Sequence, residues 1–151
     1  MRRRIYEISG LIDRKPFHLF AVMLAILNLS GIGNPNYLTT LSVAGAIFSS
    51  LLSLLIKLAF KTRRPEHNKY RIIKYGFPSG HSHVIFTTAT IYSYYVPALT
   101  ALFFLTAAFV SVSRVTTKAH THTDVIAGGI LGILTGLLMV ALGNTFFNPV
   151  A

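Results

Sequence analysis

Residues 37–60 read YLTTLSVAGAIFSSLLSLLIKLAF, an unbroken stretch in which Lys57 is the only charged residue. An α-helix needs about 20 mostly apolar residues to cross the hydrocarbon core of a bilayer, and this stretch is longer than that. Lys57 lies near its end, where a charged side chain is costly unless it is hydrated, paired or used. The sequence therefore predicts a membrane-spanning helix with a basic residue close to one membrane face.

Similar apolar runs on both sides of this helix extend the prediction to the whole chain. We expect five spans, over residues 17–32, 37–60, 82–96, 98–115 and 124–147. Residues 1–16 mix basic and apolar residues at helical spacing, which predicts an amphipathic helix lying in the interface. The last span is rich in glycine, and small residues allow close helix packing in lipid. The predicted fold is an all-α integral membrane bundle of five to six helices, forming a single domain over residues 1–151 with a transmembrane core over 17–147.

Composition supports a membrane protein. The chain is 52% hydrophobic and 12% charged, whereas a soluble domain carries about a quarter charged residues. The net charge of +10 is typical of nucleic-acid binding, but here the basic residues flank apolar segments, a pattern that favours a membrane surface and anionic head groups. We therefore expect a bilayer and no nucleic acid as partners. The chain has no cysteine, which excludes disulfides and thiolate metal sites. No small-residue cleavage site is evident after the first span, so we expect no removable signal peptide.

Two topologies are open around Pro97. Residues 82–113 can form one long kinked helix, which separates His81 and Arg114 by about 45 Å, or a hairpin that brings them together. The hairpin places all 14 Lys and Arg residues on one side of the membrane, so the charge pattern favours it. The positive-inside rule then places that side in the cytoplasm of a cell-membrane protein.

The first polar cluster contains Lys57 and Arg64. The two are seven residues apart and face the same way if the helix continues, with Pro65 ending it. A lysine point charge and an arginine fork both suit phosphate oxygens. An ordinary basic stop at the membrane boundary is the alternative interpretation.

The second cluster is Pro78-Ser79-Gly80-His81, directly before a predicted span. Gly80 permits a tight turn, and backbone N–H groups at a helix start bind anions. The Ser79 hydroxyl adds a donor, and His81 is expected at the mouth of the site. The alternative is a helix cap followed by an interfacial histidine.

The third cluster contains Arg114, His120 and Asp124. His120 and Asp124 are four residues apart and share a face if they are helical. A carboxylate bonded to one imidazole nitrogen fixes the tautomer and leaves the other nitrogen as nucleophile or base. His122 is expected to point elsewhere. The alternative is an Asp helix cap beside a loop histidine.

The other histidines are expected at the interface or in solvent: His18, His67 and His83. Zinc binding by the clustered histidines is disfavoured, because the sequence has no His-x-x-x-His pair and the neighbouring Lys and Arg residues repel a cation. We therefore expect no metal and no cofactor.

Together the clusters match a known family. Lys57-x6-Arg64-Pro65, Pro78-Ser79-Gly80-His81 and Ser113-Arg114-x5-His120-x3-Asp124 resemble the three signature motifs of the type-2 phosphatidic acid phosphatase superfamily, in order and at full spacing. That family includes lipid phosphatases, polyprenyl diphosphate phosphatases, glucose-6-phosphatase and vanadium haloperoxidases.

The resemblance implies a role for each residue. His120 is expected to attack phosphorus and form a phosphohistidine, Asp124 to orient His120, and His81 to protonate the leaving group. The phosphoryl oxygens are expected to be held by Lys57, Arg64, Arg114, Ser79 and the Gly80 N–H. The implied function is a metal-independent membrane phosphatase acting on a lipid phosphate or an isoprenyl diphosphate such as undecaprenyl diphosphate.

Two features depart from the family pattern. Members with lipid substrates usually have six spans, whereas five are expected here. Bacterial polyprenyl diphosphate phosphatases of the family act on the outer face, whereas the charge bias here indicates the cytoplasmic face. Two alternative functions stay open: a non-enzymatic scaffold that binds anionic lipids, and a vanadate-dependent oxidase that uses the same pocket.

Overall fold

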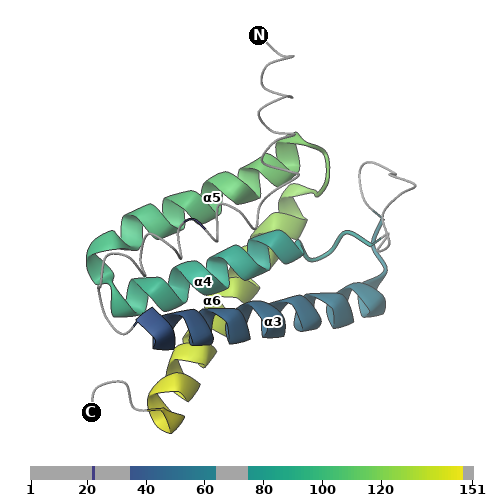
Figure 1. Ribbon diagram of the computed structural model, residues 1–151. Coiled ribbons are helices and arrows are strands. Elements are labelled where there is room, and N and C mark those ends of the chain that lie inside the picture. Colours follow the sequence, from purple (N-terminus) through teal and green to yellow (C-terminus); the bar gives the residue numbers. More distant parts are fainter. Residues whose placement is uncertain (1–21, 23–34, 64–74, 148–151) are drawn as a thin grey trace.

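The computed structural model describes residues 22, 35–63 and 75–147 of the chain. Over these residues the elements are α3 (Pro35–Phe60), α4 (Gly80–Tyr95), the short 3-10 helix η1 (Pro97–Leu99), α5 (Thr100–Thr116) and α6 (His122–Phe146) (Figure 1). The described part contains no β-strand, only an isolated antiparallel bridge between Arg63 and Tyr75. The predicted interfacial helix over residues 1–16, the predicted span over 17–32 and Arg64 lie outside the described residues.

Among the described residues, three helical segments are long and apolar enough to cross a membrane: Asn36–Phe60, Pro97–Thr116 and His122–Phe146. The all-helical prediction is confirmed for the described residues, although the count of five to six helices is not. The predicted span over 82–96 corresponds to α4, which has only 16 residues. This helix packs against α3, α5 and α6, so its mixed composition matches a position inside the bundle rather than against lipid.

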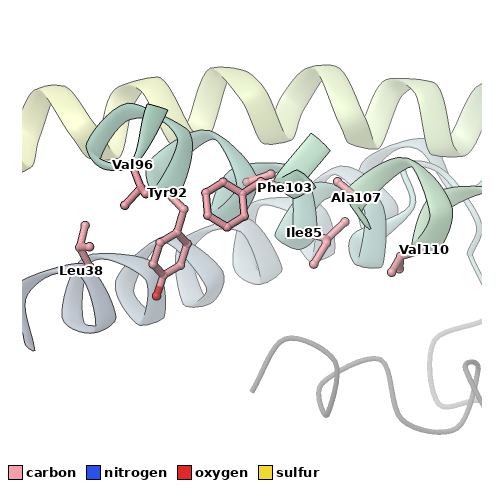
Figure 2. Packing of buried hydrophobic residues seen from close by; sticks show 8 residues of the cluster. Leu38, Ile85, Tyr92, Val96, Phe103, Ala107 and Val110 are labelled. Atoms are coloured by element: carbon pink, nitrogen blue, oxygen red, sulfur yellow. The ribbon is translucent and has the colours of Figure 1, made fainter. Parts of the chain in front are cut away.

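A hairpin at Pro97 joins α4 to α5. The Val96 N–H caps α4 by donating to the Tyr92 carbonyl at 2.8 Å, and after η1 the chain returns as α5 alongside α4 (Figure 1). Tyr92 and Phe103 meet across the hairpin with ring centroids 5.6 Å apart. Their neighbours form the main apolar core, which Figure 2 shows: Leu38, Ile85, Val96, Ala107 and Val110. The hairpin is therefore confirmed, and a single kinked helix over residues 82–113 is excluded.

Glycines bring α6 into backbone contact with α4. A Cβ on Gly128 would lie 2.5 Å from the Ser79 carbonyl oxygen, and one on Gly132 would lie 2.5 Å from the His83 carbonyl oxygen. A Cβ on Gly136 would lie 2.5 Å from the Cβ of Thr90. These glycines are spaced four residues apart and therefore share one face of α6. The predicted close packing is confirmed, and it presses α6 directly against α4.

The bundle is apolar outside and partly polar inside. Large hydrophobic side chains are exposed on its surface, among them Ile47, Leu51, Leu55, Leu105, Phe109, Ile126 and Leu134. Hydroxyl side chains are buried between the helices, among them Ser42, Ser49, Ser53, Thr87, Thr88 and Thr135. This distribution is typical of helices packed in lipid, where hydroxyl groups form hydrogen bonds between helices.

Candidate active site

Four helix ends meet at one end of the bundle, on the right in Figure 1: the ends of α3 and α5 and the starts of α4 and α6. Two backbone contacts close this end. The Ser79 N–H before α4 donates to the Asp124 carbonyl at 2.9 Å, and the His120 N–H donates to the Arg114 carbonyl at 3.1 Å. The second and third polar clusters, which are far apart in sequence, therefore lie together.

His120 and Asp124 form a buried pair. The His120 Nδ1 lies 3.4 Å from Asp124 Oδ2, and the two residues are 3% and 4% exposed. The same carboxylate oxygen accepts the Thr121 N–H at 2.9 Å, while the Asp124 N–H donates to Thr121 Oγ1 at 3.1 Å. This reciprocal capping box begins α6. One carboxylate of Asp124 therefore contacts the imidazole and takes part in the capping box at the helix start.

The reason predicted for this pairing is wrong, although the pair forms. Helix α6 begins at His122, so His120 lies before the helix and shares no helical face with Asp124. Thr121 occupies the N-cap position, and Asp124 is the third helical residue rather than the cap. His122, which was expected to point elsewhere, is exposed, whereas His120 and Asp124 are buried.

A tight turn brings His120 back over the end of α5. The Arg114 carbonyl accepts the N–H groups of both Ala119 and His120 at 3.1 Å. Lys118 adopts a left-handed backbone with φ 55, a conformation that non-glycine residues rarely adopt. The Arg114 side chain is 3% exposed in the last turn of α5. A cationic residue is thus buried at the base of the turn that carries His120.

Ser79 is the N-cap of α4. Its hydroxyl oxygen accepts the Ser82 N–H at 3.4 Å and the Ser82 hydroxyl at 3.1 Å. The helix-cap interpretation of this cluster is therefore confirmed. Gly80 begins the helix without a left-handed φ, and the nearest neighbour of an added Cβ is the Ser53 Cβ at 3.8 Å. The conformational freedom that Gly80 was expected to provide is not used, because neither the backbone nor the packing requires glycine there.

Lys57 connects α3 to the segment before α4. Its side chain is 6% exposed, and its Nζ donates to the Gly76 carbonyl at 3.2 Å and to the Pro78 carbonyl. Helix α3 ends at Phe60, as the predicted span does, and Lys61 has φ 50. The continuation to residue 64 under which Lys57 and Arg64 would face the same way therefore does not occur. Lys57 is therefore a buried cation that holds the second cluster in place through backbone carbonyls.

Thr62 connects the two described segments on either side of residues 64–74. Its carbonyl accepts the Gly76 N–H at 2.9 Å, and its hydroxyl accepts the Phe77 N–H at 2.8 Å. The Phe60 and Phe77 rings pack beside this contact, with centroids 5.6 Å apart. Sequence reasoning missed Thr62, since no local pattern shows that it meets residues 76 and 77.

The predictions for the two histidines of α4 had different outcomes. His81 lies in the first turn and is partly exposed, at the end of the bundle where it was expected. His83 is 0% exposed, so its predicted placement at the interface or in solvent is wrong. Its Nδ1 lies 2.8 Å from Ser53 Oγ and its Nε2 lies 2.9 Å from Thr135 Oγ1. Sequence reasoning missed both hydroxyl partners, although Ser53 lies one helical turn before Lys57.

Within residues 22, 35–63 and 75–147, no three His, Asp or Glu side chains are grouped closely enough to hold a metal ion. Of the predicted site residues, those described at this end of the bundle with ionisable side chains are Asp124, Lys57, Arg114, His81 and His120.

Comparisons with known proteins show what the chain is similar to. The lipid A 1-phosphatases of Rhizobium etli and Rhizobium johnstonii are each 30% identical to the chain over 115 residues, which is 66% of the chain and 50% and 47% of those proteins. A PA-phosphatase related-family protein of Dictyostelium discoideum is 30% identical over 90 residues, covering 48% of the chain and 33% of that protein. The chain thus spans about half the length, or less, of the curated relatives it matches.

A solved structure shares the fold. The PAP2 type phosphatidylglycerolphosphate phosphatase of Bacillus subtilis superposes with a TM-score of 0.68 at 20% identity, covering 95% of this chain and 77% of that one. The profile of the PAP2 superfamily matches residues 37–147, which include all the described site residues. With most of its length matched by the family profile, the chain belongs to the PAP2 superfamily.

Proposed function

We propose that the chain is an integral membrane phosphatase that removes phosphate from a lipid phosphate or isoprenyl diphosphate, through a phosphohistidine on His120 and without a metal ion. One observation carries the proposal: Asp124 contacts His120 through its carboxylate and Ser79 through its carbonyl. A single residue thus links the expected nucleophile to the expected phosphate-binding turn, Pro78–Gly80.

His120 is the proposed nucleophile. Its Nδ1 faces Asp124, and a carboxylate at that nitrogen favours the tautomer with the proton on Nδ1. The lone pair then resides on Nε2, which attacks phosphorus. The N–P bond forms as the bond from phosphorus to the leaving oxygen breaks, and Asp124 stabilises the positive charge that develops on the imidazole.

His81 is the proposed acid and base. It donates its proton to the leaving oxygen in the first step. In the second step it accepts a proton from the water that attacks the phosphohistidine, so inorganic phosphate is released and both histidines return to their starting states. The position of His81 in the first turn of α4, next to the proposed phosphate-binding turn, supports this role.

The proposed phosphate pocket combines buried cations with helix-start donors. Lys57 and Arg114 are 6% and 3% exposed, and preorganised charge in such water-poor surroundings stabilises the transition state strongly. The hydroxyl of Ser79 and the N–H of Gly80 complete the pocket, and the missing side chain at Gly80 leaves room for a phosphoryl oxygen. Arg64, outside the described residues, is the third proposed cation.

The lipid character of the substrate is inferred from the surroundings of the pocket. It lies at one end of a bundle whose outer surface exposes large apolar side chains, so an acyl or prenyl tail can lie along the helices while its head group enters the pocket. The names of the relatives, a lipid A 1-phosphatase and a phosphatidylglycerolphosphate phosphatase, support a phosphorylated lipid. The single domain over residues 1–151 and the cytoplasmic orientation remain part of the proposal.

A phosphate-release assay tests the function. Purified protein in detergent with EDTA would be given phosphatidate, phosphatidylglycerophosphate, lipid A or a polyprenyl diphosphate. We expect the wild type to release phosphate from at least one lipid and His120→Asn to release none. With a 32P-labelled lipid, the label should stay on His120 of the wild type when the reaction is stopped without acid. Wild-type turnover by His120→Asn would disprove the mechanism. Lipid binding without hydrolysis would favour the scaffold, and halide oxidation with vanadate and peroxide would favour the oxidase.

A further inference from the structure

His83 is the most buried ionisable side chain that the proposed mechanism does not use. It is 0% exposed and lies two residues after His81 on α4. Its two ring nitrogens contact hydroxyls on two other helices, Ser53 of α3 at 2.8 Å and Thr135 of α6 at 2.9 Å. An imidazole with both nitrogens occupied in this way cannot act as an acid or base without breaking a contact between helices.

From this geometry we infer that His83 is a positioning residue, which sets where α3 and α6 lie relative to the phosphate-binding turn of α4. The inference rests on the proposed function for its effect on turnover. The two contacts of the His83 ring, with Ser53 of α3 and Thr135 of α6, form a bridge between these helices. The existence of this bridge does not depend on the proposed function.

The contact to α3 acts on Lys57. Ser53 and Lys57 are one helical turn apart and share a face of α3. Lys57 in turn donates to the carbonyls of Gly76 and Pro78. The backbone N–H of His83 donates to the Ser79 carbonyl at 3.0 Å. His83 therefore contacts both ends of the proposed phosphate-binding turn. It reaches one end indirectly, through Ser53 and Lys57 of α3, and the other end directly, through the Ser79 carbonyl.

The contact to α6 fixes the helix that carries Asp124, but farther from the chemistry. Gly132 already places the α6 backbone against the His83 carbonyl, where a Cβ would lie 2.5 Å from that oxygen. Thr135 lies three turns beyond Asp124, and Asp124 has its own contact with the Ser79 N–H at 2.9 Å. Loss of the Thr135 contact should therefore loosen the bundle more than it displaces the nucleophile.

A second hydroxyl contact reinforces the bridge. The Thr87 hydroxyl donates to the His83 carbonyl at 2.9 Å and meets Ser49 Oγ at 2.8 Å. Ser49 and Ser53 are again one turn apart on α3. Apolar contacts between helices tolerate sliding, whereas paired hydrogen bonds between helices specify one register. A displacement of about 1 Å in a catalytic group can lower the rate on the order of 10²-fold.

Two amide substitutions separate the arms of the bridge. An asparagine amide reaches the position of Nδ1 and keeps the contact with Ser53, whereas a glutamine amide reaches the position of Nε2 and keeps the contact with Thr135. We expect His83→Asn to retain kcat within about threefold and His83→Gln to lose on the order of 10-fold or more, with KM for the lipid little changed in both. Ser53→Ala should match His83→Gln in kcat, and Thr135→Val should match His83→Asn.

The readouts distinguish positioning from a role in stability alone. Thermal unfolding and size-exclusion profiles of all four variants establish that they are folded. Equal kcat losses in His83→Asn and His83→Gln, or wild-type kcat in Ser53→Ala, would overturn the inference. A double substitution of Ser53→Ala with His83→Gln should cost no more kcat than His83→Gln alone, because both remove the same contact; additive losses would also overturn it.

A measurement without turnover keeps this inference separate from the proposed function. In protein labelled with 15N-histidine, the ring signals of His83, assigned by their loss in His83→Asn, should change in both Ser53→Ala and Thr135→Val. If the wild type released no phosphate from any lipid, the proposed function would fail while this experiment still tested the bridge. Ring signals unchanged in both hydroxyl variants would disprove the bridge even in an active enzyme.

Discussion

At the scale of single residues, Asp124 shows how one side chain can serve two purposes. Its carboxylate completes the capping box of α6 by accepting the Thr121 N–H and also contacts His120, and its carbonyl accepts the Ser79 N–H. The helix-cap interpretation and the catalytic interpretation of this residue are therefore compatible. Substitutions can separate them, because an amide retains the acceptor for the Thr121 N–H but loses the negative charge that the proposed mechanism requires.

We predict that Asp124→Asn lowers kcat on the order of 10³-fold or more, by the effect seen for the equivalent substitution in a serine-protease triad, with a small change in melting temperature. Thr121→Ala is the matched control, since it removes the hydroxyl that accepts the Asp124 N–H and should cost about 1 kcal/mol of stability with a much smaller effect on kcat. Steady-state kinetics and thermal unfolding of both proteins measure the two effects. Equal kcat in Asp124→Asn and wild type would contradict the assignment.

Gly80 provides a second prediction at this scale. An added methyl group has ordinary packing space, with its nearest neighbour, Ser53 Cβ, at 3.8 Å, so Gly80→Ala should leave the melting temperature unchanged or slightly raised. If the missing side chain makes room for a phosphoryl oxygen, the same substitution should lower kcat/KM at least about 10-fold. Unfolding curves and phosphate release test both parts. Full activity in Gly80→Ala would show that the phosphate does not approach this backbone.

At the scale of helices, α4 is the element on which the others are arranged. It packs against α3, α5 and α6 and carries the proposed phosphate-binding turn at its start. Its polar residues are a consequence of this position, because a helix enclosed by others can exchange hydrogen bonds that a lipid-facing helix cannot. The glycine face of α6 allows these bonds to form by letting the two backbones approach.

We predict that Gly132→Ala destabilises the bundle by about 1–3 kcal/mol, because the new methyl group would lie 2.5 Å from the His83 carbonyl and 2.6 Å from the Phe86 Cβ. Gly129→Ala, on the same helix, is the control. Its methyl group would lie no closer than 3.4 Å to the Phe86 ring, so its stability should stay close to that of the wild type. Unfolding in detergent compares the two, and equal stability of both variants would contradict the close α4–α6 contact.

At the scale of the whole molecule, the topology gathers the charged groups of the described residues at one end. Helices α3 and α5 end there and α4 and α6 begin there. This brings the proposed phosphate-binding turn close to three residues of other segments: Lys57, Arg114 and His120. The opposite end contains the hairpin at Pro97. This separation allows the orientation of the protein in a membrane to be measured.

The absence of cysteine makes single-cysteine labelling straightforward. We predict that Lys118→Cys, beside the site, is protected from a membrane-impermeant maleimide in intact cells, whereas Ala98→Cys, in the opposite turn, is labelled. Both positions are exposed, and the reason is the positive-inside rule. The reverse labelling pattern would place the site on the outer face, as the resemblance to polyprenyl diphosphate phosphatases implies.

The sequence predicted best those features that depend on residues close together along the chain. Spanning helices follow from runs of apolar residues, and the predicted segments 37–60, 98–115 and 124–147 agree closely with α3, α5 and α6. The glycine spacing in the last span predicted its close packing. The spacing of the three polar clusters identified the family, because their residue types and order can be read without knowing any contact.

The tertiary structure decided which groups meet. His120 reaches Asp124 through a turn with a left-handed backbone at Lys118, a position where the sequence has no glycine that would predict such a turn. His83 is buried because α3 and α6 supply hydroxyls on either side of its ring. Periodicity along the chain gives the face of a helix but not its neighbour. The spanning helices and the family were therefore determined by the sequence, whereas the burial of His83 and the link from Asp124 to Ser79 depend on contacts between residues distant along the chain.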